Sequence, residues 1–192
     1  QSPVQIENAG VHSGMPMGPL AFADSMGFKY ILDAEKQMAL QLGAGYKRSS
    51  AFSILEQMII EFDRQGKMRN SGFYNYPENE KAHLWPNIFS VFYKKDAVEM
   101  SQTEISRRLL FIQCIEAVRC LEEGVVSNSY EANLGSIHGL GFAPFKGGVI
   151  QYINDFGVAE FVDYAKVLEL KFGSRFKVPK TISALAAIVD HV

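Results

Sequence analysis

Residues 139–148 read GLGFAPFKGG, and residues 14–19 read GMPMGP. Each stretch is followed by an apolar segment that ends in an acid or amide and a glycine, DSMG at residues 24–27 and NDFG at residues 154–157. Glycine lets the backbone approach a neighbour closely, and proline presets the first turn of a helix. The pattern therefore predicts a tight entry into a helix that occurs twice in the chain. We call these two entries the elbows.

The two elbows belong to a longer internal repeat. Gly18 in the first stretch and Gly147 in the second set an offset of 129 residues, and IENA at residues 6–9 and YEAN at residues 130–133 lead into them. The halves are unequal, because the apolar helix expected from Ile105 to Leu121 has no counterpart before the first elbow. A repeat without its central helix exposes apolar surface, which terminal repeats normally avoid. We therefore expect either that the first copy is truncated at its start or that a partner supplies the missing helix.

That apolar helix has a strong start signal. The run Ser101-Gln102-Thr103-Glu104 forms a capping box, in which Ser101 and Glu104 satisfy each other's backbone amides. The helix is expected to run to about Glu123, with Gly124 as its stop. Between Leu109 and Val118 it is apolar on nearly every face, which places it in the middle of a bundle.

Most of the remaining chain also has helical periodicity. Further helices are expected from an apolar stripe over residues 52–62 that ends at Gly66, a start at Asn128 with Glu131, a stripe over residues 161–172 that ends at Gly173, and a last helix over residues 182–189. The only strand signal is at residues 176–178. The region 67–96 is predicted to be irregular, with a polar break at residues 94–96. We expect two all-α domains, residues 1–96 and 97–192.

Composition excludes several classes of protein. The chain has 192 residues, a formal net charge of -2, 47% hydrophobic and 21% charged residues, which exclude a collagen, a disordered tail and a disulfide scaffold. The near-neutral charge argues against nucleic-acid binding. Residues 1–10 show no signal peptide, and no apolar run is long enough for a membrane span, so a cytoplasmic protein is expected. Cys114 and Cys120 are expected on one helix about 240° apart around its axis, so they can neither pair with each other nor share a metal.

Several polar and aromatic residues allow two interpretations. Lys146 could bind an anion such as a CoA phosphate, although a solvated lysine is favoured. Tyr74, Tyr76 and Trp85 could form a surface for an acyl chain, although anchoring of the irregular region is favoured. Glu116 and Arg119 are expected to form an ion pair.

Motifs for metals and nucleotides are weak. None of His12, His83, His138 and His191 has a second ligand at helical spacing, so polar loop or helix-end roles are favoured over metal binding. His12 and His138 precede the elbows, where a bond to the loop backbone is favoured over a ligand contact. Gly43-Ala44-Gly45 lacks the third glycine of a dinucleotide-binding turn and is read as a helix stop. No catalytic, cofactor-binding or metal-binding residue is assigned.

The motifs together resemble a known family. The first elbow with Asp24 and Gly27 resembles the C-terminal domain of L-3-hydroxyacyl-CoA dehydrogenases, and GFYNY at residues 72–76 and LWP at residues 84–86 resemble the end of its first copy in multifunctional fatty-acid oxidation enzymes. Residues 108–126 and the second elbow are similar to the second copy. In that copy Ile112 and Ile115 replace a proline and an asparagine that are usual in the family, which fits a copy that serves packing.

The resemblance implies a fold and a setting. The fold would be two tandem helical domains of the 6-phosphogluconate-dehydrogenase C-terminal-like type that form an internal pseudo-dimer. In the multifunctional enzymes a hydratase module and an NAD-binding Rossmann module precede them, and the family oxidises the 3-hydroxyl group with NAD and a His–Glu pair. That pair has no matching positions here. The chain alone is therefore expected to be inactive, to brace the missing modules and to wall the acyl-CoA cleft, with Met15, Pro16 and Met17 as candidates for substrate contact.

Partners and alternatives follow from the same resemblance. The missing modules and acyl-CoA are expected partners, a thiolase subunit is a further candidate, and the truncated first copy is expected to self-associate. One alternative is a free-standing helical module that binds proteins or acyl-CoA without redox activity. A second alternative is a smaller, single-function dehydrogenase with a duplicated C-terminal domain and no hydratase module.

Overall fold

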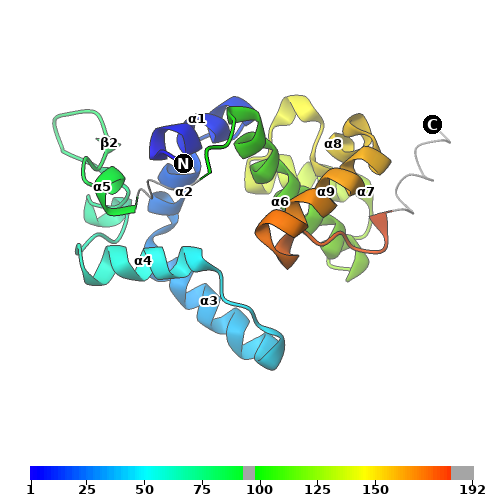
Figure 1. The fold of residues 1–192 in the computed structure, drawn as a ribbon, viewed down its shortest axis with the longest axis horizontal. Helices are drawn as coiled ribbons and strands as arrows, with labels where there is room; N and C mark the ends of the chain where they lie inside the picture. Colours follow the sequence, from blue (N-terminus) through cyan, green and yellow to red (C-terminus); the bar gives the residue numbers. More distant parts are fainter. Residues whose placement is uncertain (93–97, 183–192) are drawn as a thin grey trace. The chain divides into compact units, whose positions relative to one another are not determined.

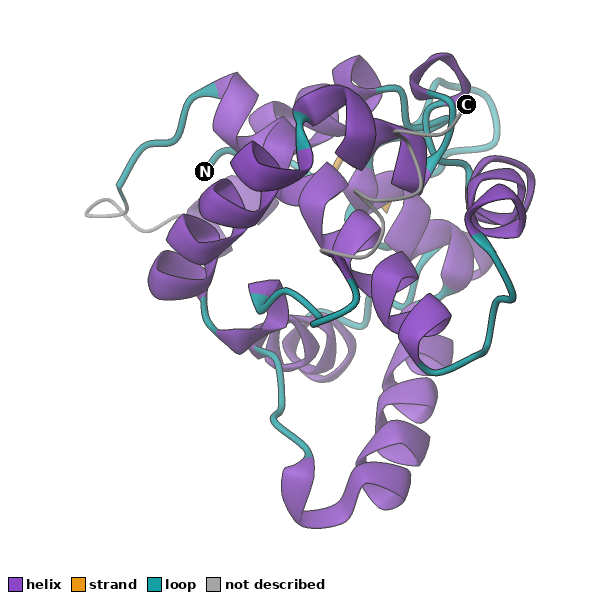
Figure 2. Ribbon diagram, turned by 90° about the vertical axis from the view of Figure 1, so that its right-hand side faces the viewer, coloured by secondary structure: helices purple, strands orange, loops and turns teal. Residues whose placement is uncertain are grey.

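The computed structural model describes residues 1–92 and 98–182. Most of these residues are helical (Figure 1), and within this part of the chain the strands are limited to one short antiparallel pair (Figure 2). The prediction of an all-α protein is therefore confirmed. The expected helix at residues 182–189 and the polar break at residues 94–96 lie outside the described residues, apart from Ile182.

The elements follow one another with short connections. The α-helices are α1 (Pro3–Ser13), α2 (Pro19–Met26), α3 (Phe28–Leu42), α4 (Ser50–Ile60), α5 (Ile88–Phe92), α6 (Gln102–Glu122), α7 (Ser129–Leu140), α8 (Val149–Phe156) and α9 (Val158–Phe172). Four short 3-10 turns are η1 (Gly43–Gly45), η2 (Lys67–Arg69), η3 (Pro144–Lys146) and η4 (Ser174–Phe176), and the two strands are β1 (Tyr74–Asn75) and β2 (His83–Leu84).

The chain divides into two compact units. Unit 1 comprises Gln1–Asn8 and Met17–Glu99, and unit 2 comprises Ala9–Pro16 and Met100–Val192. Helix α1 thus contributes its first half to unit 1 and its second half to unit 2. The expected domain boundary after residue 96 lies in the stretch that the structure does not describe, so the division into domains 1–96 and 97–192 stays a prediction.

Helix α6 forms the centre of unit 2, as its sequence predicts. The Ser101 hydroxyl accepts from the Glu104 amide at 3.2 Å, and the Ser101 amide donates to the Glu104 carboxylate at 3.3 Å, which confirms the capping box. The buried side chains of α6 are those of Ile105, Leu110, Phe111, Cys114, Ile115 and Val118. Phe111 stacks on Phe161 of α9 with ring centroids 4.1 Å apart and planes 8° from parallel.

Other local signals in unit 2 are also confirmed, with one exception. The Asn128 side chain caps α7 by accepting from the Glu131 amide at 2.9 Å, and Gly173 ends α9. Arg119 forms the expected ion pair with Glu116 at 2.8 Å. The predicted strand at residues 176–178 is wrong, because Phe176 turns into the core at the end of η4.

Unit 1 has a separate core, to which α3 and α4 both contribute and where these two helices contact each other (Figure 1). Its buried members are Phe28, Leu32, Leu55, Met58, Phe73 and Ile88. Gly43 ends α3, as expected. Gly66 does not end α4, which stops at Ile60. Instead Gly66 has a φ of 112° and contacts the backbone of α2, where a Cβ atom would lie 2.7 Å from the Asp24 carbonyl oxygen.

The two units repeat one helix pair. Helices α2 and α8 each have 8 residues, and α3 and α9 each have 15. The glycine between the helices of each pair has nearly the same backbone conformation, φ 83° and ψ 130° at Gly27 against φ 89° and ψ 121° at Gly157. The repeat register over these helices is therefore 130 residues. The offset of 129 from Gly18 to Gly147 is wrong by one residue, because Gly148 is the N-cap of α8.

Candidate functional site

The first elbow is built around Glu7. This glutamate is buried on α1, and its Oε1 atom accepts from the amide of Leu20 at 2.5 Å, in the first turn of α2. A Cβ atom on Gly18 would lie 2.2 Å from the other carboxylate oxygen. Glycine is therefore needed at residue 18 to let the carboxylate reach the helix start, where its charge is favourable.

The second elbow has the same construction with an amide in place of the acid. Asn133 of α7 accepts through Oδ1 from the amides of Ile150 and Gln151, at 2.8 and 3.2 Å. A Cβ atom on Gly148 would lie 2.6 Å from the Asn133 Cα atom. Glu7 therefore corresponds to Asn133 in the structure. The alignment of residues 6–9 with residues 130–133 in the sequence had paired Glu7 with Glu131 instead. The second elbow is longer by four residues, which hold η3 and its Pro144.

The three candidates for substrate contact lie in the first elbow, and none of them lines the apolar cavity described below. Met15 is half-buried and Pro16 is exposed, both in unit 2, while Met17 is exposed in unit 1. The Pro16 ring lies against Gly141, where a Cβ atom would come within 2.9 Å of Pro16 Cγ. The Met17 sulfur accepts from the Ser25 hydroxyl at 3.7 Å. Their role in contacting a substrate stays a prediction.

A buried carboxylate organises the loop after α4. Asp24 of α2 is fully buried and accepts from the amides of Phe73 and Tyr74, each at 2.8 Å, and from the Tyr76 hydroxyl at 2.9 Å. Burial raises the pKa of the Asp24 carboxyl, while these hydrogen bonds and the charge of Arg64 act against the rise. The close approach requires Gly72, where a Cβ atom would lie 2.1 Å from Asp24 Oδ1.

Arg64 and Tyr74 complete this network. The Arg64 guanidinium donates to the carbonyl oxygens of Gly72 and Tyr74, at 2.6 and 2.9 Å, and lies 4.6 Å from the centre of the Trp85 ring. The Tyr74 hydroxyl donates to Glu7 at 2.6 Å. The favoured interpretation of Tyr74, Tyr76 and Trp85 as anchors of an irregular region is therefore confirmed. The hydrogen bonds of Glu7, Asp24 and Arg64 named here all have their partners within unit 1, so the network fits a structural role.

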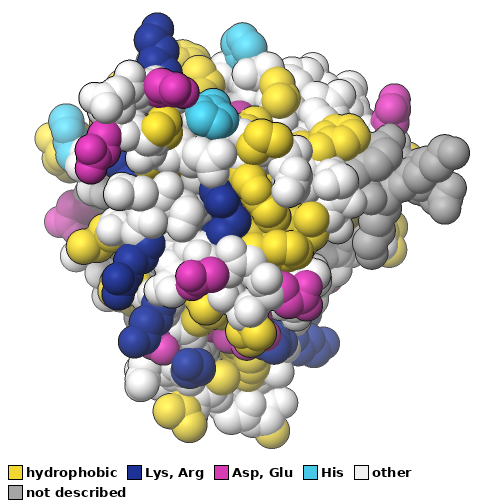
Figure 3. Space-filling model, turned by 90° about the vertical axis from the view of Figure 1, so that its left-hand side faces the viewer, with side chains coloured by type: hydrophobic (Ala, Val, Ile, Leu, Met, Phe, Trp, Pro, Cys, Tyr) yellow, Lys and Arg dark blue, Asp and Glu magenta, His cyan; other side chains and the backbone are white. Residues whose placement is uncertain are grey.

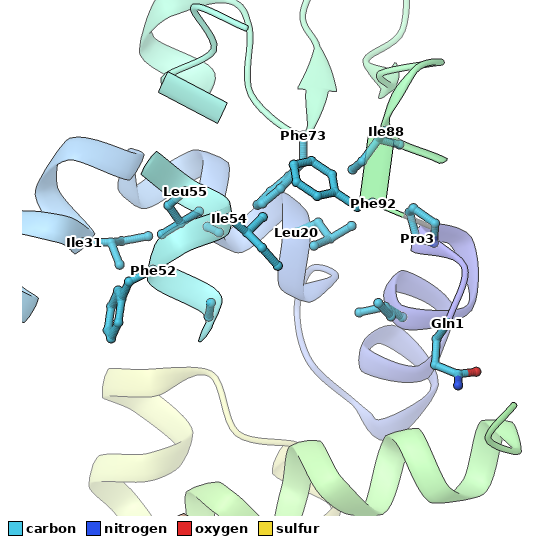
Figure 4. Close-up of a pocket in the computed structure, with 13 residues that line it drawn as sticks. Gln1, Pro3, Leu20, Ile31, Phe52, Ile54, Leu55, Phe73, Ile88 and Phe92 are labelled. Carbon is cyan, nitrogen blue, oxygen red and sulfur yellow. The ribbon is translucent and has the colours of Figure 1, made fainter. Parts of the chain in front are cut away.

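An apolar cavity opens beside this network in unit 1. Its volume is about 440 Å³. Figure 4 shows Leu20, Ile54 and Phe73 converging on it from three different segments. Almost all of the lining is hydrophobic, and it comes from Gln1, Pro3, Ile6, Leu20, Ala23, Ile31, Ala51, Phe52, Ile54, Leu55, Phe73, Ile88 and Phe92. We call this space the unit 1 groove. Such a lining binds apolar material and supplies no acid, base or nucleophile.

Many large hydrophobic side chains are also exposed at the surface. Figure 3 shows a face on which they gather next to basic side chains. On α2 the large apolar side chains of Phe22 and Met26 are 46% and 42% exposed. The sequence-based expectation of uncovered apolar surface near the first elbow therefore agrees with the exposure of these two residues.

The remaining candidates have no shared site. Lys146 lies over the rings of Phe145 and Tyr152, at 5.2 and 5.1 Å, and His138 is exposed on α7. Cys114 and Cys120 are both free thiols, as expected, and burial raises the pKa of Cys114. Among residues 1–92 and 98–182, no cluster of three or more His, Cys, Asp or Glu side chains could hold a metal ion. Within the same ranges, no helix is both long and apolar enough to cross a membrane.

Comparison with known proteins gives a consistent result. Residues 1–76 match the family described as the 3-hydroxyacyl-CoA dehydrogenase C-terminal domain. The chain is 31% identical over 187 residues to the fatty acid oxidation complex subunit alpha of Shewanella halifaxensis, a match that covers 97% of this chain and 26% of that protein. The same subunit of Vibrio vulnificus is 28% identical over 172 residues, which cover 90% of this chain and 24% of that protein.

A solved structure has the same fold. The dehydrogenase part of multifunctional enzyme 1 from C. elegans superposes with a TM-score of 0.63 at 18% identity, covering 96% of this chain and 42% of that one. The chain spans about a quarter of the length of the curated relatives. Residues 1–76 therefore match the 3-hydroxyacyl-CoA dehydrogenase C-terminal domain family, and almost the whole chain is similar to one part of the fatty acid oxidation complex alpha subunits.

Proposed function

We propose that this chain is the helical C-terminal part of an NAD-dependent L-3-hydroxyacyl-CoA dehydrogenase that acts in fatty-acid β-oxidation. In this role it braces a nucleotide-binding module and walls the acyl-CoA cleft. The observation that carries the proposal is the match to alpha subunits over 97% of the chain, together with the family match at residues 1–76. The relatives are about four times longer, which leaves room for further modules in the intact enzyme.

The described residues fit a supporting role better than a chemical one. Glu7 and Asp24, the buried acids of the elbow region, are fully engaged in hydrogen bonds to backbone amides and tyrosine hydroxyls. NAD requires a glycine-rich turn between a strand and a helix. The nearest string, Gly43–Gly45, instead follows helix α3 and is exposed, so the residues present here do not fit the cofactor. NAD would bind to a module outside this sequence.

A domain exchange tests the proposal. The matching region of a complete alpha subunit, such as that of Shewanella halifaxensis, is replaced by residues 1–192, and oxidation of NADH by acetoacetyl-CoA is followed by absorbance. We expect the hybrid to keep measurable dehydrogenase activity and a subunit that lacks the region to lose it. A hybrid that folds and binds NAD but has no more activity than the deletion would contradict the proposal.

The isolated chain provides the complementary experiment. We expect no dehydrogenase turnover and no heat of NAD binding in a calorimetric titration, because neither the cofactor turn nor an unengaged acid–base pair is present among the described residues. Turnover or tight NAD binding by residues 1–192 alone would contradict the proposal that the cofactor site and the reacting groups lie on another module.

The cleft role of the first elbow can be tested in the same hybrid. Met15→Ala and Met17→Ala are expected to raise the KM for acyl-CoA by a few fold, since each removes apolar contact area from the cleft wall. Met68→Ala is the matched control, because Met68 is 93% exposed on η2. Equal KM values in all three variants would remove the elbow from the substrate site.

A further inference from the structure

We propose that unit 2 has a binding site for a phosphate group where helix α6 meets the turn η4, and that Arg108, Lys171 and Arg175 hold this group. The ligand is a phosphate dianion, either free or attached to a larger molecule. All three residues belong to unit 2. The inference does not depend on the proposed dehydrogenase function, and it is tested by binding and not by activity.

Arg108 of α6 is a partly buried cation without an oxygen acceptor among the described residues. Its guanidinium carbon lies 3.7 Å from the centre of the Phe172 ring, and its Nη1 atom donates to the sulfur of Met100 at 3.4 Å. Its Nε atom is buried and has no hydrogen-bond partner within residues 1–92 and 98–182. The ring attracts the charge from one face, but the N–H groups lie in the plane of the guanidinium, where a thioether is only a weak acceptor. Buried polar groups are nearly always hydrogen-bonded, so an acceptor for Arg108 is missing from this part of the chain.

A second guanidinium acts on the first. Burial lowers the pKa of Arg108, and the charge of Arg175 on η4 lowers it further, while Glu104 acts in the opposite direction. The rings that the two arginines contact are neighbours, because Phe172 and Phe176 have centroids 6.2 Å apart and the Arg175 guanidinium lies 5.3 Å from the centre of Phe176. No carboxylate of the described ranges forms an ion pair with either arginine. Like charges repel, so an anion between these two groups would be stabilising.

Arg119 on the same helix is, in contrast, bonded to three oxygen atoms. Its guanidinium donates to Glu116 at 2.8 Å and to the carbonyl oxygens of Arg175 and Lys177 at 3.0 Å each. These bonds hold the backbone of η4 against α6, while the exposed side chain of Arg175 makes no hydrogen bond to any described residue. The position from which Arg175 extends is therefore fixed before a ligand binds, which reduces the entropy lost on binding.

The charge of the cluster favours a dianion. Lys171 of α9 lies 3.8 Å from Glu104, measured from Nζ to Oε1, and the two side chains are 56% and 39% exposed. Together with Arg108 and Arg175 they make three cations and one carboxylate, which leaves an excess of two positive charges. A guanidinium binds phosphate through two parallel N–H···O bonds, and a phosphate has enough oxygen atoms to accept from two guanidiniums at once. A single carboxylate has only two oxygen atoms, so the cluster fits a phosphate better.

Titration of the intact chain with inorganic phosphate tests the site. The ionic strength is kept constant with chloride, and binding is followed by calorimetry and by broadening of the phosphorus NMR signal. Adenosine monophosphate is the second probe, with adenosine as its phosphate-free control. We expect a Kd below about 1 mM for at least one of the two phosphates and no binding of adenosine. Tighter binding of inorganic phosphate would identify a free ion as the ligand, and tighter binding of the nucleotide would identify a phosphate on a larger molecule.

Arg175→Gln is the main variant, because the side chain of Arg175 is exposed and the fold can form without it. We expect it to weaken phosphate binding by about ten- to one hundredfold, the effect of losing hydrogen bonds to a charged group. Arg108→Lys keeps the charge but not the planar fork and should weaken binding by about tenfold or more. Arg69→Gln is the matched control and should bind phosphate as the original chain does, because Arg69 is also an exposed arginine on a 3-10 turn, η2 of unit 1.

Thermal unfolding gives a readout that a purely structural role of Arg175 would not change. In phosphate-free buffer of low ionic strength, Arg175→Gln should be at least as stable as the original chain, because the repulsion with Arg108 is removed. Added phosphate should raise the unfolding temperature of the original chain and of Arg69→Gln, and should leave that of Arg175→Gln almost unchanged.

Three results would overturn the proposal. One is the absence of phosphate binding by the original chain with both probes. Another is equal affinity of the original chain, Arg175→Gln and Arg69→Gln, which would mean a general attraction of anions to the surface. The third is binding of adenosine as tight as that of adenosine monophosphate, which would mean that the phosphate group is not what the protein recognises.

Discussion

Glu7 and Asn133 occupy equivalent positions and perform the same task. Glu7 accepts from the amide of Leu20, and Asn133 accepts from the amide of Ile150, so each side chain reaches from one helix to the free amides at the start of another. Neither helix start has a side chain of its own that could do this, because its N-cap is glycine. In both elbows the free amides at the helix start are therefore satisfied by a side chain of the preceding helix and not by the N-cap residue.

This relationship predicts a graded effect at residue 133. Asn133→Ala removes the acceptor for two amides and should lower the free energy of unfolding by about 1 kcal/mol, the usual effect of a lost helix cap. Asn133→Asp keeps the acceptor and adds a charge that is favourable at a helix start, so it should retain at least the wild-type stability. Denaturant unfolding followed by circular dichroism measures both, and equal losses in the two variants would show that the amides are satisfied in another way.

The buried acid of unit 1 gives a second prediction. Asp24→Ala leaves the amides of Phe73 and Tyr74 without an acceptor, so it should lower stability by about 2 to 5 kcal/mol. Trp85 is the single tryptophan of the chain and lies beside this loop, so its fluorescence reports the change. Asp155→Ala, on the exposed face of α8, is the control and should have almost no effect.

Tyr74 predicts how stability depends on alkaline pH. Burial, followed by the hydrogen bond and charge of Glu7, raises the pKa of Tyr74 above its ordinary value of 10.0. A group whose pKa is raised by folding stabilises the protein below its unfolded pKa and loses that contribution as pH rises through the folded pKa. Tyr74→Phe should therefore be about 1 to 3 kcal/mol less stable at neutral pH, and the difference should shrink above pH 10. A difference that stays constant through pH 11 would contradict this linkage.

Two glycines on either side of the second elbow should respond in opposite directions. Gly148→Ala forces a side chain into a φ of 106° and against the backbone of Asn133, which should cost about 2 to 5 kcal/mol. Gly135→Ala lies within helix α7, where a Cβ atom meets nothing within 4 Å, and should stabilise by about 1 kcal/mol. Thermal unfolding of the two variants gives the comparison, and a neutral Gly148→Ala would refute the close approach.

The last prediction concerns Phe111, whose ring stacks on that of Phe161 at the centre of unit 2. Phe111→Ala removes a fully buried ring and should cost about 3 to 5 kcal/mol. Phe145→Ala removes a ring that is 73% exposed and should change stability by less than about 0.5 kcal/mol. Similar losses in both variants, measured by denaturant unfolding, would mean that α6 is not the central helix of its unit.

Signals carried by neighbouring residues predicted the fold well. The capping box at Ser101 and Glu104, the cap at Asn128 and the stop at Gly173 each depend on contacts within one helical turn, and all three are present. The register of the repeat failed by one residue because Gly147 and Gly148 are adjacent, and nothing local distinguishes the glycine that starts α8 from the one that ends η3.

Contacts between distant residues could not be predicted in the same way. The partners of Asp24 lie about 50 residues along the chain, and strands β1 and β2 are two residues each, too short for an alternating pattern. The uncovered apolar surface was expected from the repeat, but the lining of the groove combines α1 to α5, and only the folded chain brings these segments together.

Helix α1 imposes a constraint on how this chain can change. Its residues up to Asn8 pack in unit 1, and those from Ala9 pack in unit 2, with no break in the helix between them. Each residue advances a helix by about 100°, so inserting or deleting a single residue here would turn Glu7 out of register with Ala9, whose carbonyl oxygen accepts from Ser106. Because unit 1 comprises Gln1–Asn8 and Met17–Glu99 while residues 9–16 belong to unit 2, a single cut in the chain cannot release either unit whole.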